Sequence, residues 1–458
     1  AASGCSALPA VKQSAGQPNT INTDKDWQQA ARIVKNLKVP SFPDKDFNIA
    51  RFGAQPGKDA HTAIKKAIDA CHQAGGGRVI VPAGNYKTGP IHLKSNVNFH
   101  IEKGAKLTFS TNPDDYLPEV ITRWQGMELM GFSPLIYAYE QENIAITGEG
   151  VLDGAASMEN WWPWKSNEEW NAPGFPSQAP VRDQLMKDVE AGKPVSERRY
   201  GKDNYLRPPF IQLYKCQTLL IENVTLLRAP FWLINPVLCT DVTVRGVHLE
   251  SLGPNSDGCN PESCKNVLIE RCYFDTGDDC IAIKSGRNAD GRRLATPSEN
   301  IVIRDCQMRA GHGGVVLGSE ISGGARNIFV ENCHMSGPDL DRGLRIKTNS
   351  IRGGTIEHLR FRNITIGQVR DALVINFYYE EGDAGSFDPT VRDIVIENLM
   401  CEQAARAFQV RGFTRKPIEQ LHLQNVHIVK AGEKGNLENI KGLTLANVTL
   451  NGEELASR

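Results

Sequence analysis

The sequence lacks the features that assign many proteins quickly, having no long apolar run, no surplus of either charge and no CxxC pair. Its 52 lysine and arginine residues nearly balance 53 aspartate and glutamate residues, so net charge predicts neither nucleic-acid binding nor attraction to an acidic membrane surface. The glycine run 75–77 is not followed by Gly-Lys-Ser/Thr, which favours a turn over a phosphate-binding loop. Affinity for a charged substrate must therefore come from a local cluster.

Eleven cysteines without a CxxC pair argue against zinc ribbons and redox dithiols, and favour buried thiols. The segment Ala1–Cys5 resembles the end of a bacterial lipoprotein signal, although the apolar stretch that should precede the cysteine is absent. We expect Cys5 to be a lipidation site or an uncleaved remnant. This context predicts an extracytoplasmic protein, either periplasmic or secreted.

One domain with an N-terminal extension is expected. Residues 1–45 form an extension with one short helix, and residues 46–458 form the main domain. Within that domain, the apolar spacing over 61–73 predicts a helix that caps the first coil. Residues 112–209 read as an irregular insertion in which only 143–154 is sheet, and it holds five of the seven tryptophans. Some of these rings should pack within the insertion, and others, with Trp162 as a candidate, should stack on sugar.

An internal repeat decides the fold. Nine seven-residue segments superimpose without gaps, 22 to 35 residues apart, with apolar second, fifth and seventh letters. They are LIENVTL (220–226), TVRGVHL (243–249), LIERCYF (268–274), VIRDCQM (302–308), FVENCHM (329–335), RFRNITI (360–366), VIENLMC (395–401), HLQNVHI (422–428) and TLANVTL (444–450).

The change of parity between the second and fifth letters predicts two short inward-facing strands with a corner at the fourth letter. One turn per repeat then describes an all-β protein, a parallel β-solenoid of about ten coils whose core forms by stacking. In this register Cys272, Cys306 and Cys333 form an inward stack, so disulfides are disfavoured. The Asn-x-Thr signals fall at the corner, where stacked turn asparagines explain them better than glycosylation does.

The same register gathers charged residues on one face. Asp257 aligns with Asp279 on adjacent coils, and Asp278 aligns with His312 at an offset of 34 residues. Two further outward positions belong to Arg345 and Lys347.

Three carboxylates crowded together raise one another's pKa, so a purely structural origin is disfavoured. Glycosidic hydrolysis needs this set, with one carboxylic acid to protonate the leaving oxygen and carboxylate to activate water. Asp257 and Asp279 are placed to hold a water between them, which leaves Asp278 as the acid.

The motifs NSD (255–257), GDDC (277–280), GHGG (311–314) and RIK (345–347) resemble glycoside hydrolase family 28, over roughly residues 45 to 450. The resemblance implies a right-handed parallel β-helix that hydrolyses α-1,4-galacturonan with inversion. It also implies that Asp278 is the general acid, that Asp257 and Asp279 activate water, that His312 supports the site, and that Arg345 and Lys347 bind a substrate carboxylate.

Two details differ from the commonest fungal pattern, namely Ser256 for threonine and Gly314 after Gly313. The strings GHGGVVLGSE (311–320), GLRIKTNS (343–350) and ENWWPWK (159–165) instead resemble the bacterial exo-acting branch. The tryptophan-rich insertion would then wall off one end of the groove.

We therefore expect an inverting exo-polygalacturonase that acts on a pectic polysaccharide or oligogalacturonide, with no cofactor, no metal, no nucleic acid and no protein partner implied. Further substrate-binding candidates are Asn255, Lys284, Tyr378, Tyr379 and Trp162. The alternatives are an endo-acting or rhamnogalacturonan-directed member of the same family, a calcium-dependent pectate lyase, and a non-catalytic solenoid that binds polysaccharide.

Overall fold

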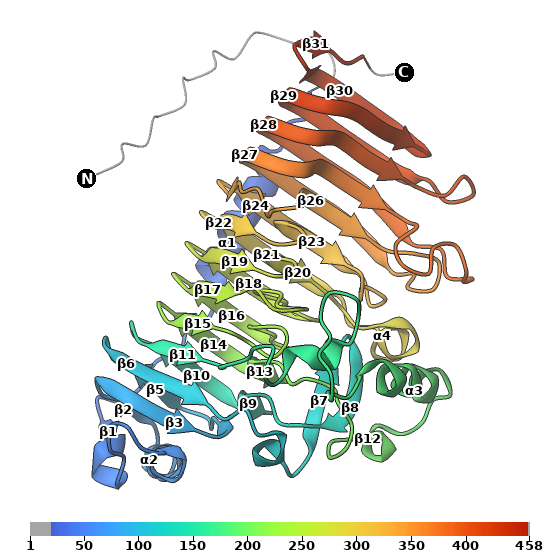
Figure 1. Cartoon of the computed structure of the whole chain (residues 1–458). Helices are drawn as coiled ribbons and strands as arrows, with labels where there is room; N and C mark the ends of the chain where they lie inside the picture. The colour runs from blue at the N-terminus through green and yellow to red at the C-terminus, as the bar shows by residue number, and fades with distance from the viewer. Residues whose placement is uncertain (1–19, 457–458) are drawn as a thin grey trace.

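A computed structural model describes residues 20–456, which form a right-handed parallel β-helix (Figure 1). Nearly all its strand pairs are parallel and join one coil to the next, as the repeat predicted. The inward side chains of successive coils form one continuous apolar core. Within 20–456, no helix is both long and apolar enough to cross a membrane.

The strands fall into three stacks, each containing one strand of successive coils. The stack before the corner contains β1 (Asp46–Asn48), β2 (Gly77–Val81), β5 (Val97–Ile101), β10 (Glu142–Thr147), β14 (Gln217–Glu222), β16 (Thr240–Arg245), β18 (Lys265–Glu270), β21 (Ser298–Arg304) and β24 (Ala325–Glu331). The stack after the corner contains β3 (Gly84–Thr88), β6 (Ala105–Phe109), β11 (Val151–Asp153), β15 (Thr225–Leu227), β17 (His248–Ser251), β19 (Tyr273–Thr276), β22 (Gln307–Ala310) and β25 (His334–Met335).

The third stack carries the predicted site residues. Its strands are β4 (Ile91–His92), β9 (Ile136–Tyr139), β13 (Ile211–Tyr214), β20 (Ile281–Ile283), β23 (Val315–Gly318) and β26 (Arg342–Lys347). In the last coils the stacks merge into long bent strands, β27 (Thr355–Asn376), β28 (Thr390–Arg411), β29 (Ile418–Glu438) and β30 (Ile440–Leu450), followed by the short β31 (Glu453–Glu454).

The predicted corner is confirmed at the fourth letter of every repeat. All nine residues there have φ between 52° and 63°, the left-handed region in which asparagine and glycine are tolerated best. From Asn332 to Asn447 the corner asparagines form a ladder in which each side-chain amide donates to the carbonyl oxygen of the asparagine one coil earlier, over 2.8–3.3 Å. Stacked turn asparagines therefore explain the Asn-x-Thr pattern at Asn363 and Asn447.

Cysteines behave as small core residues. Cys272, Cys306 and Cys333 are buried in one inward stack, and every cysteine between residues 20 and 456 is a free, buried thiol. Cys5 lies outside the described residues.

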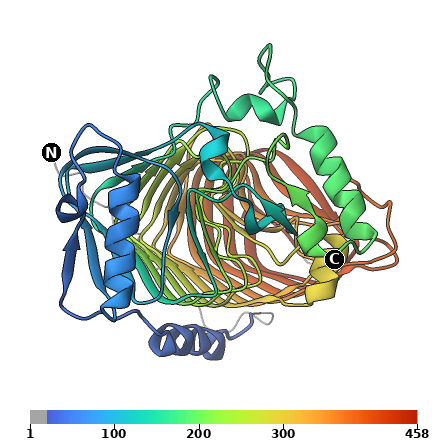
Figure 2. The same ribbon diagram turned by 90° about the horizontal axis from the view of Figure 1, so that it is seen from below.

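Both predicted helices outside the insertion are present. Helix α2 (His61–Gln73) covers the open end of the first coil and buries Ile64 and Ile68 against the core (Figure 1). Helix α1 (Asp24–Asn36) lies on the outer surface of the coil, on a different side from helix α3 (Ala179–Glu190) (Figure 2). There Trp27 packs on Phe329 with ring centroids 5.9 Å apart.

The insertion is more ordered than its sequence suggested, so the expectation of an irregular segment is wrong. It contains an antiparallel hairpin, β7 (Val120–Trp124) and β8 (Met127–Gly131), extended by β12 (Arg199–Tyr200), together with α3. These elements and the facing coil enclose a separate apolar cluster that includes Leu185 and Val189. The cluster joins residues that are far apart in the sequence, so neither the hairpin nor the helix shows a long periodic pattern of apolar residues.

The remaining elements are short. They are helix α4 (Asn288–Leu294) and the 3-10 helices η1 (Ile49–Phe52), η2 (Pro113–Tyr116), η3 (Trp162–Lys165) and η4 (Val195–Glu197).

Candidate active site

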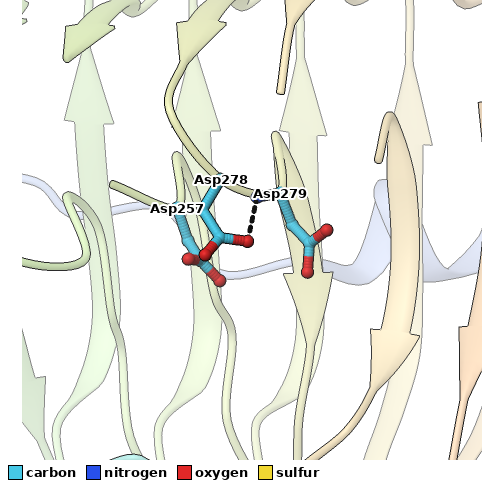
Figure 3. A group of neighbouring side chains, drawn as sticks. All are labelled: Asp257, Asp278 and Asp279. Carbon is cyan, nitrogen blue, oxygen red and sulfur yellow. Dashed lines mark hydrogen bonds between the residues drawn. The ribbon is translucent and has the colours of Figure 1, made fainter. Parts of the chain in front are cut away.

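Three aspartates meet where adjacent coils present the same position. Cys259 pairs with Ile281, and the amide of Gly258 donates to the carbonyl oxygen of Asp279 over 3.0 Å, which confirms the predicted alignment of Asp257 with Asp279. One carboxylate oxygen of each aspartate lies within 4.8 Å of the others. Figure 3 shows the three side chains and the bond from the Asp279 amide to Asp278 Oδ1, at 2.9 Å.

Asp279 is held by two cations from a later coil. The inward Leu344 and Ile346 of β26 alternate with Arg345 and Lys347, which therefore project to the opposite face. Lys347 Nζ lies 2.6 Å from Asp279 Oδ2, and Arg345 Nη1 lies 3.2 Å from Asp279 Oδ1. Burial opposes ionisation of Asp279, but the charges of Lys347 and Arg345 outweigh it and lower the pKa of this carboxyl.

Asp278 faces His312 on the next coil. His312 Nδ1 lies 3.1 Å from Asp278 Oδ1, and the amide of His312 donates to the carbonyl oxygen of Asp278. The negative charge of Asp278 and the hydrogen bond to it raise the pKa of His312 to about 9. Burial alone would raise the pKa of Asp278, but the charge of His312 reverses this and lowers it. At neutral pH the pair therefore holds one proton.

Asp257 is the one of the three aspartates whose pKa is raised. Its exposed fraction is 3%, it accepts a hydrogen bond from Asn260 Nδ2 over 2.9 Å, and Lys284 Nζ lies 3.9 Å away. Burial, and next the neighbouring charge of Asp278, raise the pKa of Asp257 well above that of an ordinary aspartate. The three carboxyls thus have pKa values that are pushed apart, a pattern typical of acid–base sites.

Asp257 and Asp278 line a cavity of about 990 Å³, and Asp279 lies behind its wall, where it contacts the cavity-lining Arg345 and Lys347. The site is more enclosed than an open groove, since Asp257 and Asp279 are almost completely buried and Asp278 has only 15% of its side chain exposed. The insertion and the loop 377–389 cover one side of the coil face at this point, so only part of the cavity opens to solvent.

Arg287 joins these two covering segments. Its Nη1 donates to Gln125 Oε1 of the insertion over 3.2 Å, and its Nη2 donates to Glu380 Oε2 of the loop after β27 over 3.1 Å. Arg182 of α3 also donates to Gln125, over 2.9 Å, and lies 4.0 Å from Glu380. Segments more than 250 positions apart in the sequence thereby form one continuous wall beside the aspartates.

Residues 194–449 match the family described as glycosyl hydrolases family 28. The solved structure of a hyperthermoactive exopolygalacturonase from Thermotoga maritima superimposes with a TM-score of 0.87 at 39% identity, covering 92% of this chain and 96% of that one. The chain belongs to glycosyl hydrolase family 28. It is therefore a glycoside hydrolase.

Curated relatives of this family-28 chain are more distant. An exo-poly-alpha-D-galacturonosidase of Dickeya chrysanthemi is 27% identical over 77% of this chain, and a probable polygalacturonase of Vitis vinifera is 27% identical over 77%. The chain spans 62% and 67% of the lengths of these two relatives.

The substrate-binding candidates of this family-28 protein divide into two groups. Asn255, Lys284 and Tyr379 line the cavity, and the Tyr379 ring lies 5.1 Å from Lys347 Nζ. Tyr378 instead packs against Phe413, and Trp162 donates to the carbonyl oxygen of Ala229, so the structure does not place them in the cavity.

Sequence reasoning missed the wall residues of this family-28 site, which are Gln125, Lys165, Trp170, Arg182, Arg287 and Glu380. They belong to no repeat, so no register relates them to the aspartates. The only signal was the concentration of tryptophan in the insertion, and it pointed to Trp162 instead of Trp170.

Gly314, one of the two departures from the fungal pattern, has a packing reason. A Cβ on this residue would lie 2.7 Å from Met335 Sδ and 3.0 Å from the carbonyl oxygen of Gly343. Ser256, the other departure, shares a 2.8 Å hydrogen bond with the hydroxyl of Ser251.

The three aspartates are also the one group of acidic, histidine or cysteine side chains in residues 20–456 spaced closely enough to hold a metal ion. Calcium takes six to eight oxygen ligands. Both oxygens of Asp279 already accept contacts from Lys347 and Arg345, and further cations crowd the cavity. This donor set fits acid–base chemistry better than a calcium site.

Proposed function

We propose that this family-28 hydrolase is an exo-polygalacturonase, which cleaves α-1,4 bonds at the non-reducing end of galacturonan and releases galacturonic acid with inversion. The observation that carries this is the wall joined by Arg287, which closes one side of the cavity that Asp257 and Asp278 line. The named relatives include two exo-acting enzymes of galacturonan, in agreement with it.

Asp278 and His312 supply the acid. The pair shares one proton at neutral pH, and both members line the cavity, with Asp278 lying between the other two aspartates (Figure 3). When a glycosidic oxygen lies against Asp278, the proton carried by His312 passes by way of the Asp278 carboxyl to that oxygen as the C1–O bond breaks. The leaving sugar departs with a new hydroxyl, and Asp278 remains a carboxylate beside a neutral His312 ring.

Asp257 and Asp279 supply the base. Asp279 is kept ionised by Lys347 and Arg345, whereas Asp257 has the raised pKa of a group that accepts a proton. A water held between them gives its proton to Asp257 while its oxygen bonds to C1. Proton return from Asp257 through solvent to the Asp278–His312 pair then completes the cycle.

The carboxyl spacing alone does not predict inversion. Inverting enzymes commonly separate their two carboxyls by about 6.5–9.5 Å and retaining ones by about 5–5.5 Å. Here an oxygen from each lies within 4.8 Å. Inversion remains possible because this site has a third carboxyl: two carboxylates can hold the water while the remaining carboxyl protonates the leaving oxygen.

Substrate carboxylates meet a strongly cationic cavity. Arg345 and Lys347 each have donors left over after binding Asp279, and the Tyr379 ring beside them offers a flat surface to a sugar. These residues form the first galacturonate-binding position in our proposal.

Product analysis tests the proposal. The protein is incubated with polygalacturonate, with and without a chelator, and products are followed by chromatography and by proton NMR in the first minutes. Galacturonic acid alone, appearing first as the β anomer and unaffected by chelation, is the expected result. An oligomer ladder would indicate endo action, and chelator-sensitive unsaturated ends would indicate a lyase.

An extracytoplasmic location follows from this proposed substrate, because pectic polymers do not enter the cytoplasm intact. Cell fractionation of the native host is the direct test. Activity confined to the cytoplasm would contradict it, and mass spectrometry would decide whether Cys5 carries lipid.

A further inference from the structure

Lys165 is a cavity-lining cation that the mechanism above does not use. It ends the 3-10 helix η3, whose residues Trp161 and Trp164 are buried with ring centroids 4.9 Å apart. Ser166 follows with φ of 50°, which turns the chain away. The two buried rings fix the turn, and Lys165 lines the same cavity as the aspartates.

The ammonium group of Lys165 has no partner. Within residues 20–456 it makes neither an ion pair nor a hydrogen bond, although the side chain is half-buried. Burial, and then the nearby charge of Arg207, lower the pKa of Lys165, while the charge of Asp278 opposes them. A half-buried cation without a counter-charge is costly, so its environment favours an anionic ligand.

Arg182 provides a second cation on the same wall. Its Nε is bound to Gln125, but its Nη2 lies 4.0 Å from Glu380, whose Oε2 already accepts from Arg287 and Arg352. Burial and the charge of Arg287 lower the pKa of Arg182. The wall therefore has more positive charge than Glu380 alone can compensate.

We infer that Lys165, assisted by Arg182, binds the carboxylate of the terminal galacturonate, at a position separate from the one formed by Arg345 and Lys347. The inference rests on the proposed function and deepens it. The wall stops the sugar chain, so the sugar that meets Lys165 is the chain end. Lys165 thus makes the enzyme select a uronate over a neutral sugar at the non-reducing end of the chain.

The test uses two disaccharides that differ in one group. The first is digalacturonate, and the second has the non-reducing-end carboxylate reduced to a hydroxymethyl group. We expect Lys165→Met to lower kcat/KM for digalacturonate by roughly tenfold or more, because the variant loses one charge-assisted contact. The loss should appear mainly as a higher KM. For the reduced disaccharide kcat/KM should be unchanged by the substitution.

Two variants control the test. Lys202→Met removes an exposed lysine of the same insertion that does not line the cavity, and it should leave both substrates unaffected. Lys165→Arg keeps the charge and should recover most of the activity on digalacturonate, which a purely structural role of the aliphatic chain would not explain.

The outcomes separate the two proposals. Equal losses on both disaccharides, or no loss on either, would overturn the role of Lys165 while wild-type release of galacturonic acid still supports the exo-polygalacturonase. A wild-type enzyme that releases monomer from neither disaccharide nor longer oligogalacturonides would instead overturn the proposed function, and the Lys165 inference with it.

Discussion

The central coils and the last coils of this β-helix share one repeat but use it differently. From β27 to β29 the strands run for 21 or 22 residues, bend at the corner and stack in register along most of their length. Around β20, β23 and β26 the strands span only three to six residues and are separated by turns. Those turns carry Asp257, Asp278 and His312.

Charge placement differs in the same way. The last coils hold ion pairs on their outer surface, as between Glu357 and Arg392, where water screens them. The central coils bury Asp279 with Lys347 and Arg345, where a charge without its partner is expensive. The inward apolar side chains stabilise both regions. In the central coils, the buried charges of the site lower the stability and serve the chemistry.

The largest expected effect is on turnover. Asp278→Asn removes the acid and should lower kcat by roughly 10³-fold or more, with far-UV circular dichroism unchanged. Glu357→Gln, the matched loss of one charge on the last coils, should leave kcat as it is. Near-normal turnover by Asp278→Asn would refute the role assigned to this residue.

Buried charge should dominate stability in the central coils. Lys347→Met leaves Asp279 buried with Arg345 alone, and we expect the free energy of unfolding to fall by about 3–5 kcal/mol. Arg392→Met breaks an exposed pair that water screens, and its cost should be far smaller. Denaturant titration of both variants measures the difference, and equal losses would remove the distinction between the regions.

The shared core should respond alike in both regions. Val247 and Val426 occupy the fifth letter of their repeats, and both are buried. Truncation to alanine should cost about 2 kcal/mol at either position, because each loses the same methyl groups and leaves a similar cavity. Unequal costs would show that the central turns loosen the packing beneath them.

A pH profile isolates the central site. His312 has a pKa of about 9, so the proton of its pair with Asp278 is present below that pH and lost above it. We expect kcat/KM to fall about tenfold per pH unit above about 9. The ion pair's contribution to stability should be complete below the unfolded pKa near 6.5 and should be lost as the pH rises from there to about 9.

The acidic side of that profile reports on Asp257. Its raised pKa should place the acid limb above the 3.8 of an ordinary aspartate, because the base must be ionised to accept a proton. His312→Gln should remove the alkaline limb. An alkaline limb that persists in this variant would assign the proton to another group.

Most of the fold could be read from the sequence because the inward stripe repeats nine times and the corner needs a residue that tolerates positive φ. The same register related Asp257 to Asp279 and Asp278 to His312, since residues one coil apart must stack. The predictions weakened where the repeat stopped. The hairpin β7–β8 and helix α3 were missed because each packs against residues distant in sequence.

The same limit applies within the site. The sequence alone brought together Asp257, Asp278, Asp279, His312, Arg345 and Lys347, because they lie on turns or on β26, where the apolar repeat fixes the order of the coils. Only the tertiary structure decided that the carboxylates are buried, that Tyr379 faces the cavity while Tyr378 does not, and that Lys165 and Arg182 line its wall. Those outcomes depend on the insertion meeting the loop after β27 through Arg287, a contact that no periodicity encodes.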